Sequence, residues 1–180
     1  RKGSGIWYAV LSFALFILAT SYWVYWATWV GIVAAVIVNT TYMSLAFWLF
    51  HWTRLRLGDR LGYASLVIYW LTYEFLYLRA KVNFPWVNLG NGFAKDIVLI
   101  QWYEVTGFLG GSLWVLVMNI LIFKLVKAWI QSRKEGTKPS FRDWLKLATV
   151  RRQLSWTVAL LIIPIMISVV RYLTYEEDED

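Results

Sequence analysis

Ionisable and amide side chains stand at the ends of long apolar runs in this sequence. Glu74 and Arg79 lie near the end of one such run, and Gln101 and Glu104 stand directly before another. Ionisable groups at membrane depth are costly, and they face a protein interior, a partner or a water-filled cavity. Two interpretations of Glu74 and Arg79 therefore stay open: a structural pair at a helix end, or a place that meets a charged substrate group.

The sequence lacks the residues that a catalytic triad, a phosphate-binding loop or a metal site requires. It has no Cys, and its one His, His51, stands beside arginines without a nucleophile at a suitable spacing. A serine or cysteine triad is therefore not expected. The sequence contains no glycine-rich phosphate loop and no cluster of metal ligands, so we expect no metal and no cofactor.

The composition is that of an integral membrane protein. Of 180 residues, 59% are hydrophobic and 16% are charged, and the mean hydropathy is +0.52. Apolar runs of about 18 residues or more are candidates for membrane helices. The 13 Trp and 11 Tyr fit the same class, because their rings collect at the headgroup level of a bilayer.

Hydropathy and turn residues predict an all-α integral membrane fold. We expect a single transmembrane domain over 1–180, built as a bundle of about five helices. An irregular loop with a short interfacial helix is expected at 80–106. The expected helices lie near 6–22, 28–51, 62–80, 106–130 and 153–174.

The distribution of basic residues predicts the orientation of these helices. Residues 1–2, 54–60 and 124–152 hold 14 of the 18 Lys and Arg. Positive loops stay in the cytoplasm. Five crossings then place the N-terminus of the chain in the cytoplasm, and the loop 80–106 and the C-terminus outside. Because the basic residues lie in short loops between apolar runs, no nucleic-acid partner is expected despite a net charge of +7.

The expected loop contains NFPWVNLGNG (83–92), which cannot form a spanning helix. Irregular backbone at membrane depth is tolerated only where protein buries it or where it lines a cavity. Pro85 favours an extended residue before it, and Trp86 is suited to the membrane interface. An interfacial loop anchored by Trp86 is the simpler interpretation.

The apolar run after Glu104 carries small and polar residues. Gly107 and Gly111 form a small-xxx-small pair, which typically lets a second helix approach closely. Asn119 lies in the middle of the same run, where we expect a hydrogen bond to a neighbouring helix. Packing is the favoured interpretation for these three residues.

The order of these features along the chain resembles the membrane domain of one family, the bacterial apolipoprotein N-acyltransferases. The similarity covers nearly the whole chain, and it includes the run SYWVYWATWVGIVAAVIVNTTYMSLAFWLFH (21–51). The features that carry it are Trp70, Glu74, Arg79, the FPW of 84–86, Gly90, Gln101, Gly107 and Asn119.

The resemblance implies a reaction and its partners. In this family a cysteine thiolate takes an acyl chain from a phospholipid and passes it to the N-terminal diacylglyceryl-cysteine of an apolipoprotein. The family also implies a multi-pass protein of the bacterial inner membrane. Its first helical hairpin and its nitrilase-like catalytic domain have no counterpart in this chain, so we expect the fragment alone to be inactive and no catalytic residue to lie within it.

The resemblance also suggests a role for the polar residues of the outer face. We expect six of them to line or shape a passage for lipid: Glu74, Arg79, Pro85, Trp86, Gln101 and Glu104. Two other interpretations remain from the residues themselves. A transporter could use the loop 80–106 as a re-entrant segment, although no inverted repeat is apparent. A non-catalytic scaffold would need only the glycine packing surface.

Overall fold

The computed structural model describes residues 4–80, 84–134 and 140–175. In these ranges the chain is helical, and the all-α membrane class expected from the sequence is confirmed. Cα packing divides the chain into two compact units, residues 1–88 and 89–180. The single domain expected from the sequence therefore stays a prediction, and each unit is described by itself.

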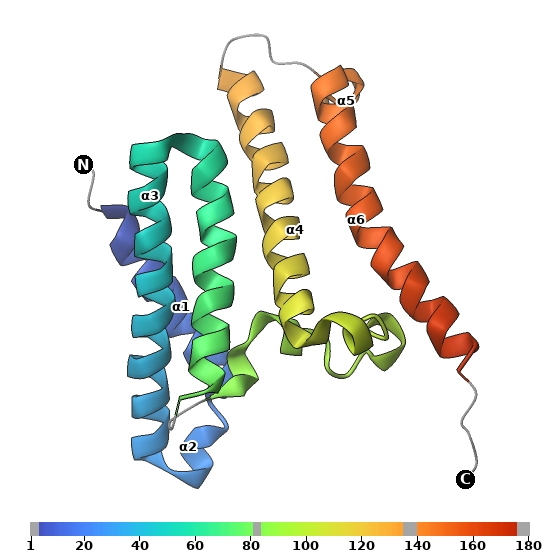
Figure 1. Ribbon diagram of the computed structural model, residues 1–180. Helices are drawn as coiled ribbons and strands as arrows, with labels where there is room; N and C mark the ends of the chain where they lie inside the picture. The colour runs from blue at the N-terminus through green and yellow to red at the C-terminus, as the bar shows by residue number, and fades with distance from the viewer. Residues whose placement is uncertain (1–3, 81–83, 135–139, 176–180) are drawn as a thin grey trace. The chain divides into compact units, whose positions relative to one another are not determined.

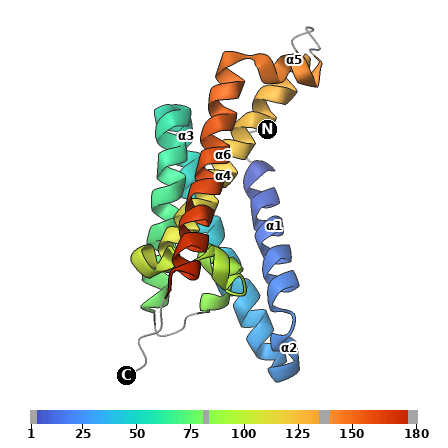
Figure 2. The same ribbon diagram turned by 90° about the vertical axis from the view of Figure 1, so that its right-hand side faces the viewer.

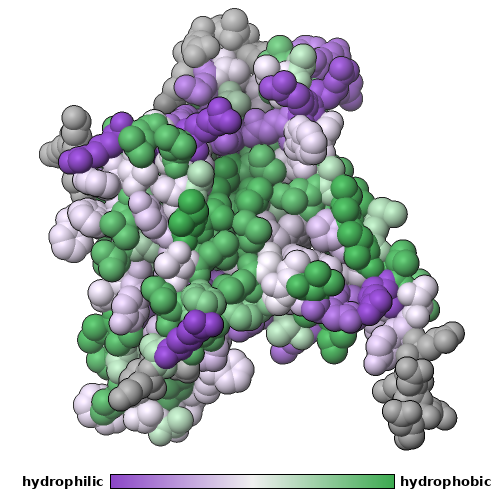
Figure 3. Space-filling model, in the orientation of Figure 1, coloured by the Kyte–Doolittle hydropathy of each residue, from purple (hydrophilic) through white to green (hydrophobic). Residues whose placement is uncertain are grey.

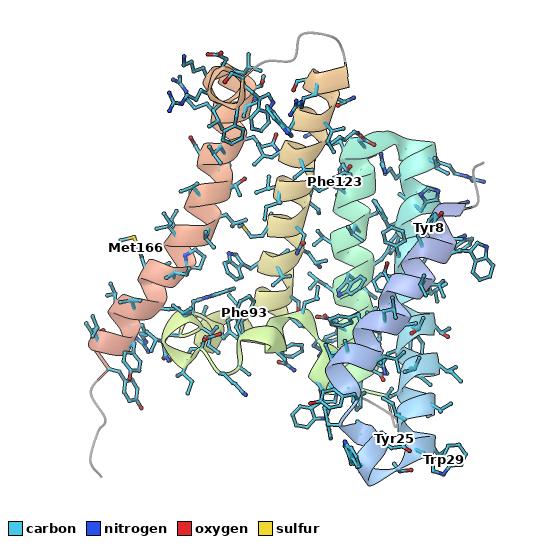
Figure 4. All side chains as sticks on the ribbon, turned by 180° about the vertical axis from the view of Figure 1, so that it is seen from behind. Tyr8, Tyr25, Trp29, Phe93, Phe123 and Met166 are labelled. Carbon is cyan, nitrogen blue, oxygen red and sulfur yellow. The ribbon has the colours of Figure 1, made fainter. Side chains whose placement is uncertain are left out.

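The first unit contains α1 (Ser4–Ser21), α2 (Val24–Ala27), α3 (Trp29–Leu78) and the 3-10 turn η1 (Pro85–Val87). The short α2 follows α1, and the chain then turns back into α3 (Figures 1 and 2). The hydroxyl of Thr28 caps α3 by accepting from the Gly31 N–H at 3.4 Å. Exposed aromatic rings gather at this turn, among them Tyr25 and Trp29 (Figure 4). Such rings are typical of a membrane interface.

The helix α3 is 50 residues long but folds back on itself at Gly58, as Figure 1 shows. Gly58 has φ 82° and ψ 177°, which only glycine adopts readily. The two halves therefore correspond to the separate helices expected near 28–51 and 62–80. Each half has at least the roughly 20 residues that a crossing needs.

The core of the first unit lies where α1 packs against both halves of α3. Ile17 and Met43 are almost completely buried. The ring of Phe13 lies 6.1 Å from Phe47 and 5.7 Å from Trp70, measured between centroids. Since Phe47 and Trp70 stand on different halves of α3, Phe13 ties the halves together through α1.

The second unit contains η2 (Leu89–Phe93), η3 (Ile97–Leu99), α4 (Tyr103–Lys134), α5 (Phe141–Lys146) and α6 (Ala148–Leu173). The indole of Trp114 donates to the Leu160 carbonyl at 2.7 Å, and the Gln153 amide donates to the Leu121 carbonyl at 3.0 Å. These two bonds join α4 to α6 at two levels. The short helix α5 lies in a stretch where the sequence predicted only a basic loop.

Three helices of the described chain are long and apolar enough to cross a membrane: α3, residues 103–133 of α4, and α6. Only 11–22% of their most apolar windows is buried inside the protein. The apolar surface therefore faces outward, as Figure 3 shows by its green residues. A protein in water would not expose so much apolar surface, whereas lipid accepts it.

Replacing Gly58 tests the turn that makes two helices of α3. A Cβ at this position meets no atom within 4 Å, so Gly58→Ala adds only backbone strain. We expect the free energy of unfolding to fall by about 1–3 kcal/mol, seen as a lower apparent melting temperature in detergent. Gly5→Ala in α1 is the control, because its Cβ also meets open space and its backbone is helical. Equal melting temperatures for Gly58→Ala and Gly5→Ala would contradict the role of Gly58.

Candidate functional site

Glu74 lies inside the first unit rather than on its surface. Its side chain is 1% exposed, and its Oε1 accepts a hydrogen bond from the indole N–H of Trp70 at 3.1 Å. Asn39, on the other half of α3, is completely buried and donates to the Ala35 carbonyl at 2.7 Å. Glu74 therefore lies among buried polar groups in the interior of the unit.

Arg79 and Trp86 lie at the surface near the end of α3. The guanidinium of Arg79 lies 4.1 Å from the centre of the Phe75 ring, a cation–π contact. Trp86 is 69% exposed, and its ring packs edge-to-face on Trp23 at 6.1 Å. Pro85 begins η1, where its fixed φ suits the first position of a turn. These residues present a cation and large aromatic surfaces at one end of the unit.

An apolar groove runs along the first unit between the two halves of α3. Its volume is about 320 Å³. Four tyrosines line it. Among them, Tyr42 and Tyr73 stack at 6.1 Å, and Tyr73 and Tyr77 stack at 5.6 Å. The lining residues are Tyr42, Leu45, Ala46, Leu49, Tyr69, Thr72, Tyr73, Leu76, Tyr77 and Ala80. Such a groove fits a flexible apolar chain.

In the second unit, a backbone contact holds η2 against the start of α4. The N–H of Gly90 donates to the Ser112 hydroxyl at 2.9 Å, and the Tyr103 hydroxyl donates to the Gly90 carbonyl at 3.0 Å. Both polar groups of one buried peptide residue are thereby satisfied, as burial requires. A Cβ at Gly90 would overlap the carbonyl of Phe108, so only glycine fits this approach.

Two further contacts hold residues 99–104, from the end of η3 to the start of α4, against the end of α6. Ser168, which is completely buried, donates to the Leu99 carbonyl at 2.9 Å and accepts from the Trp102 N–H at 3.4 Å. Arg171 binds Glu104 in a two-pronged ion pair, with N–O distances of 2.8 and 3.0 Å. The amide of Gln101 donates to the Ile97 carbonyl at 2.9 Å. Gln101 and Glu104 thus take part in contacts within the second unit, and their expected part in a lipid passage stays a prediction.

The glycines of α4 have different roles from the expected helix–helix contact. Gly107 has φ 64° and forms a kink, and a Cβ there would meet no atom within 4 Å. A Cβ at Gly111 would meet the Tyr103 ring of its own helix instead of a second helix. Gly111 therefore leaves room for Tyr103, whereas the close approach of η2 to α4 depends on Gly90. Asn119 is exposed and donates to the Val115 carbonyl of its own helix at 2.8 Å, where a bond to a neighbouring helix was expected.

Several residues of these sites were not foreseen from the sequence. The tyrosines of the groove lie scattered over 42–77, and only the fold at Gly58 brings them together. Ser112 and Ser168 are common residues in membrane helices, so their types alone give no signal. Arg171 could have been paired with Glu104, because both were expected on the same side of the membrane. No group of three or more His, Cys, Asp or Glu that could hold a metal ion lies in the described part of the chain.

Comparisons with known proteins agree with the sequence pattern. The family model of the apolipoprotein N-acyltransferase N-terminal domain matches residues 1–121. An apolipoprotein N-acyltransferase of Chlorobaculum tepidum is 30% identical over 115 residues, which cover 64% of this chain and 22% of that protein. The chain thus spans about a fifth of the length of this relative. No solved structure matches the chain.

The contact at Gly90 can be tested by adding one methyl group. The carbonyl carbon of Phe108 and the N of Ser112 would lie 3.0 and 3.1 Å from a new Cβ, and backbone atoms cannot move aside cheaply. Gly90→Ala is therefore expected to lower the free energy of unfolding by about 1–3 kcal/mol, measured by thermal unfolding in detergent. Gly92→Ala, in the same turn but with nothing within 4 Å, is expected to unfold like the wild type. Loss of stability in both variants, or in neither, would contradict the contact.

Proposed function

The chain belongs to the apolipoprotein N-acyltransferase family through that family's N-terminal domain, and we propose that it forms the membrane portion of such an enzyme. The match over residues 1–121 is the observation that carries this proposal. The apolar helices support a place in a bacterial membrane, and the proposed location is the inner membrane. The basic ends of the helices would then face the cytoplasm.

The proposed reaction has two acyl-transfer steps. A cysteine thiolate outside this chain attacks the ester carbonyl of a phospholipid, which gives a thioester and releases a lysophospholipid. The α-amino group of a diacylglyceryl-cysteine on an apolipoprotein then attacks the thioester, which gives an amide and restores the thiol. This chain has no Cys, so its proposed part is to bring the phospholipid to the outer face.

The groove between the halves of α3 is the proposed place for one acyl chain of the donor phospholipid. Its lining is mainly aromatic and aliphatic, and it lies within a helix that is apolar enough to span a membrane. Burying methylene groups against such a surface is favourable, by about 0.8 kcal/mol for each CH₂ leaving water. A lipid tail outside the groove lies in the bilayer and not in water. The groove therefore selects a tail by its shape and adds little binding energy.

Arg79 is the proposed partner of the lipid phosphate. It is an exposed cation at the end of α3, one turn from groove residue Leu76. Trp86 and Pro85 would hold the interface beside it. Glu74 is proposed to support the groove from inside the unit through Trp70, and Gln101 and Glu104 are proposed to fix the shape of the outer segment.

Filling the groove should slow lipid use selectively. Thr72 lines the groove from an exposed position of α3, so Thr72→Trp adds bulk to the groove without entering the core. In the complete enzyme we expect KM for phospholipid to rise by about tenfold, with KM for the acceptor peptide unchanged, in an assay of lipid-to-peptide acyl transfer.

Thr41→Trp is the matched control, because Thr41 is exposed on the same helix and does not line the groove. Wild-type kinetics for Thr72→Trp, or equal loss in both variants, would exclude the groove as the acyl site. Absence of any transfer by the complete wild-type enzyme would exclude the proposed function itself.

Removing the Arg79 cation should weaken phospholipid use more than protein stability. A hydrogen-bonded charge at a phosphate contributes about 1.5–3 kcal/mol, so Arg79→Ala is expected to lower kcat/KM for phospholipid by about 10-fold or more. The apparent melting temperature should stay within a few degrees of the wild type, because the side chain is exposed. Arg79→Lys should restore part of the loss. Unchanged kinetics, or unfolding of the alanine variant with no rescue by lysine, would refute this assignment.

A further inference from the structure

A second apolar pocket lies at the C-terminal part of α4, away from the N-terminal part that contacts η2. It has a volume of about 250 Å³ and no polar surface. It is formed where the end of α4, the short helix α5 and the start of α6 meet. Its lining residues are Leu125, Val126, Trp129, Phe141, Trp144, Leu145 and Leu154.

Three aromatic rings form a rigid frame for this pocket. Trp129 of α4 packs edge-to-face on Trp144 at 5.2 Å and on Phe141 at 5.5 Å. Phe141 and Trp144 stack at 5.9 Å. Trp144 is buried, whereas Phe141 is 59% exposed although it is apolar. The frame therefore opens toward its surroundings at Phe141.

The helix α5 is amphipathic over its whole length. Phe141, Trp144 and Leu145, at positions i, i+3 and i+4, share one face and line the pocket. The other positions carry Arg142, Asp143 and Lys146, all exposed. Arg142 stands at the edge of the apolar face, and Asp143 and Lys146 stand opposite it. A short helix of this composition lies in the plane of a membrane surface, with its apolar face toward the acyl chains.

Cations surround the pocket. Of the ionisable side chains described between 124 and 152, seven are basic and one, Asp143, is acidic. The guanidinium of Arg133 lies 5.4 Å from the ring centre of Trp129, at the edge of the pocket. Figure 3 shows hydrophilic residues gathered around α5 at this end of the second unit. The basic residues are Lys124, Lys127, Arg133, Arg142, Lys146, Arg151 and Arg152.

The place of the pocket, at the ends of two apolar helices, indicates what kind of molecule could fill it. Leu125, Val126 and Trp129 belong to one span candidate and Leu154 to another, so the pocket lies where two apolar helices leave the hydrocarbon. Arg133 lies at the edge of the pocket, and the other cations stand beside and beyond the pocket residues along the chain, where lipid phosphates are expected if both helices cross the membrane. An apolar cavity joined to a basic rim matches an acyl chain joined to an anionic headgroup. A nucleic acid or an acidic peptide would use the rim but leave the cavity empty.

We propose that this pocket is a binding site for an anionic phospholipid of the membrane leaflet at the basic end of α4. One acyl chain fills the space inside the frame of Trp129, Phe141 and Trp144. Its phosphate meets Arg133 and Arg142. The site is separate from the groove of α3 and does not depend on the acyl-transfer reaction.

The experiment measures the lipid that stays bound to the purified full-length protein. The protein is placed in nanodiscs with equal amounts of phosphatidylglycerol and phosphatidylcholine, then released into detergent and analysed by native mass spectrometry. We expect the wild type to retain phosphatidylglycerol preferentially. The double variant Arg133→Gln/Arg142→Gln should retain it at least about fivefold less, since each cation near a lipid surface contributes attraction.

The matched control is Arg56→Gln/Arg60→Gln at the turn of α3. Arg56 lies 4.2 Å from the Trp52 ring, as Arg133 lies over Trp129, and Arg60 is exposed like Arg142. This control should retain phosphatidylglycerol like the wild type. Equal retention of the two lipids by the wild type, or equal loss in both double variants, would overturn the proposal in favour of unspecific surface charge.

A second pair of variants tests the cavity with every cation in place. Leu154→Trp fills the pocket, whereas Leu161→Trp makes the same change at a similarly exposed position of α6 outside it. We expect loss of retained phosphatidylglycerol for Leu154→Trp only, at unchanged melting temperature. Full retention by Leu154→Trp would show that headgroups alone are attracted and would overturn the site.

Discussion

Inside a bilayer no water is present to form hydrogen bonds with backbone N–H and C=O groups. This constraint governs the structure where the helices are interrupted. Between α3 and α4 the described residues 84–102 form short 3-10 turns. Where this irregular backbone packs on α4 and α6, single side chains satisfy it: Ser112 and Tyr103 at Gly90, and Ser168 at Leu99 and Trp102. Such backbone is tolerated at membrane depth only when protein buries it in this way. Two glycines are part of the same solution: Gly90 lets η2 approach α4, and Gly111 leaves room for Tyr103.

The irregular segment in turn fixes where polar and aromatic groups stand. Arg79 and Trp86 come at the end of the first unit, with the tyrosine groove directly before them along α3. The Glu104–Arg171 pair and Ser168 tie the second unit's loop to α6. The proposed delivery of lipid would use a groove that holds a tail and, beside it, the cation and aromatic rings at the end of the first unit. The pocket framed by Trp129 and Trp144 adds a lipid contact at the other end of α4.

The fold could be predicted from hydropathy because membrane helices satisfy their own backbone, so each needs only its own apolar residues. The expected helices near 6–22 and 153–174 are observed as α1 and α6. The hydrogen-bond partners of side chains were harder to predict from the sequence, since they depend on how the helices pack. For Glu74 the sequence left both a pairing at the helix end and a substrate contact open, and it did not predict the buried bond with Trp70. The pair Gly107 and Gly111 fits a standard helix-packing motif, and only the positive φ of Gly107 shows the kink. Membership of the family, in contrast, was predicted from the order of the motifs, and the match of the family model to residues 1–121 confirms it.

The central claim is that the tyrosine groove of α3 holds an acyl chain of the donor lipid. A phospholipid with a photoreactive group at the end of one acyl chain tests it most directly. The complete enzyme is irradiated in membranes with this lipid, digested and mapped by mass spectrometry. If the groove holds the acyl chain, labelled peptides concentrate on residues 42–49 and 69–80. Their yield is higher than that of the lipid-facing residues 161–167 of α6. Labelling spread evenly over every exposed apolar helix face would contradict it, because the groove would then be no more than ordinary lipid-facing surface.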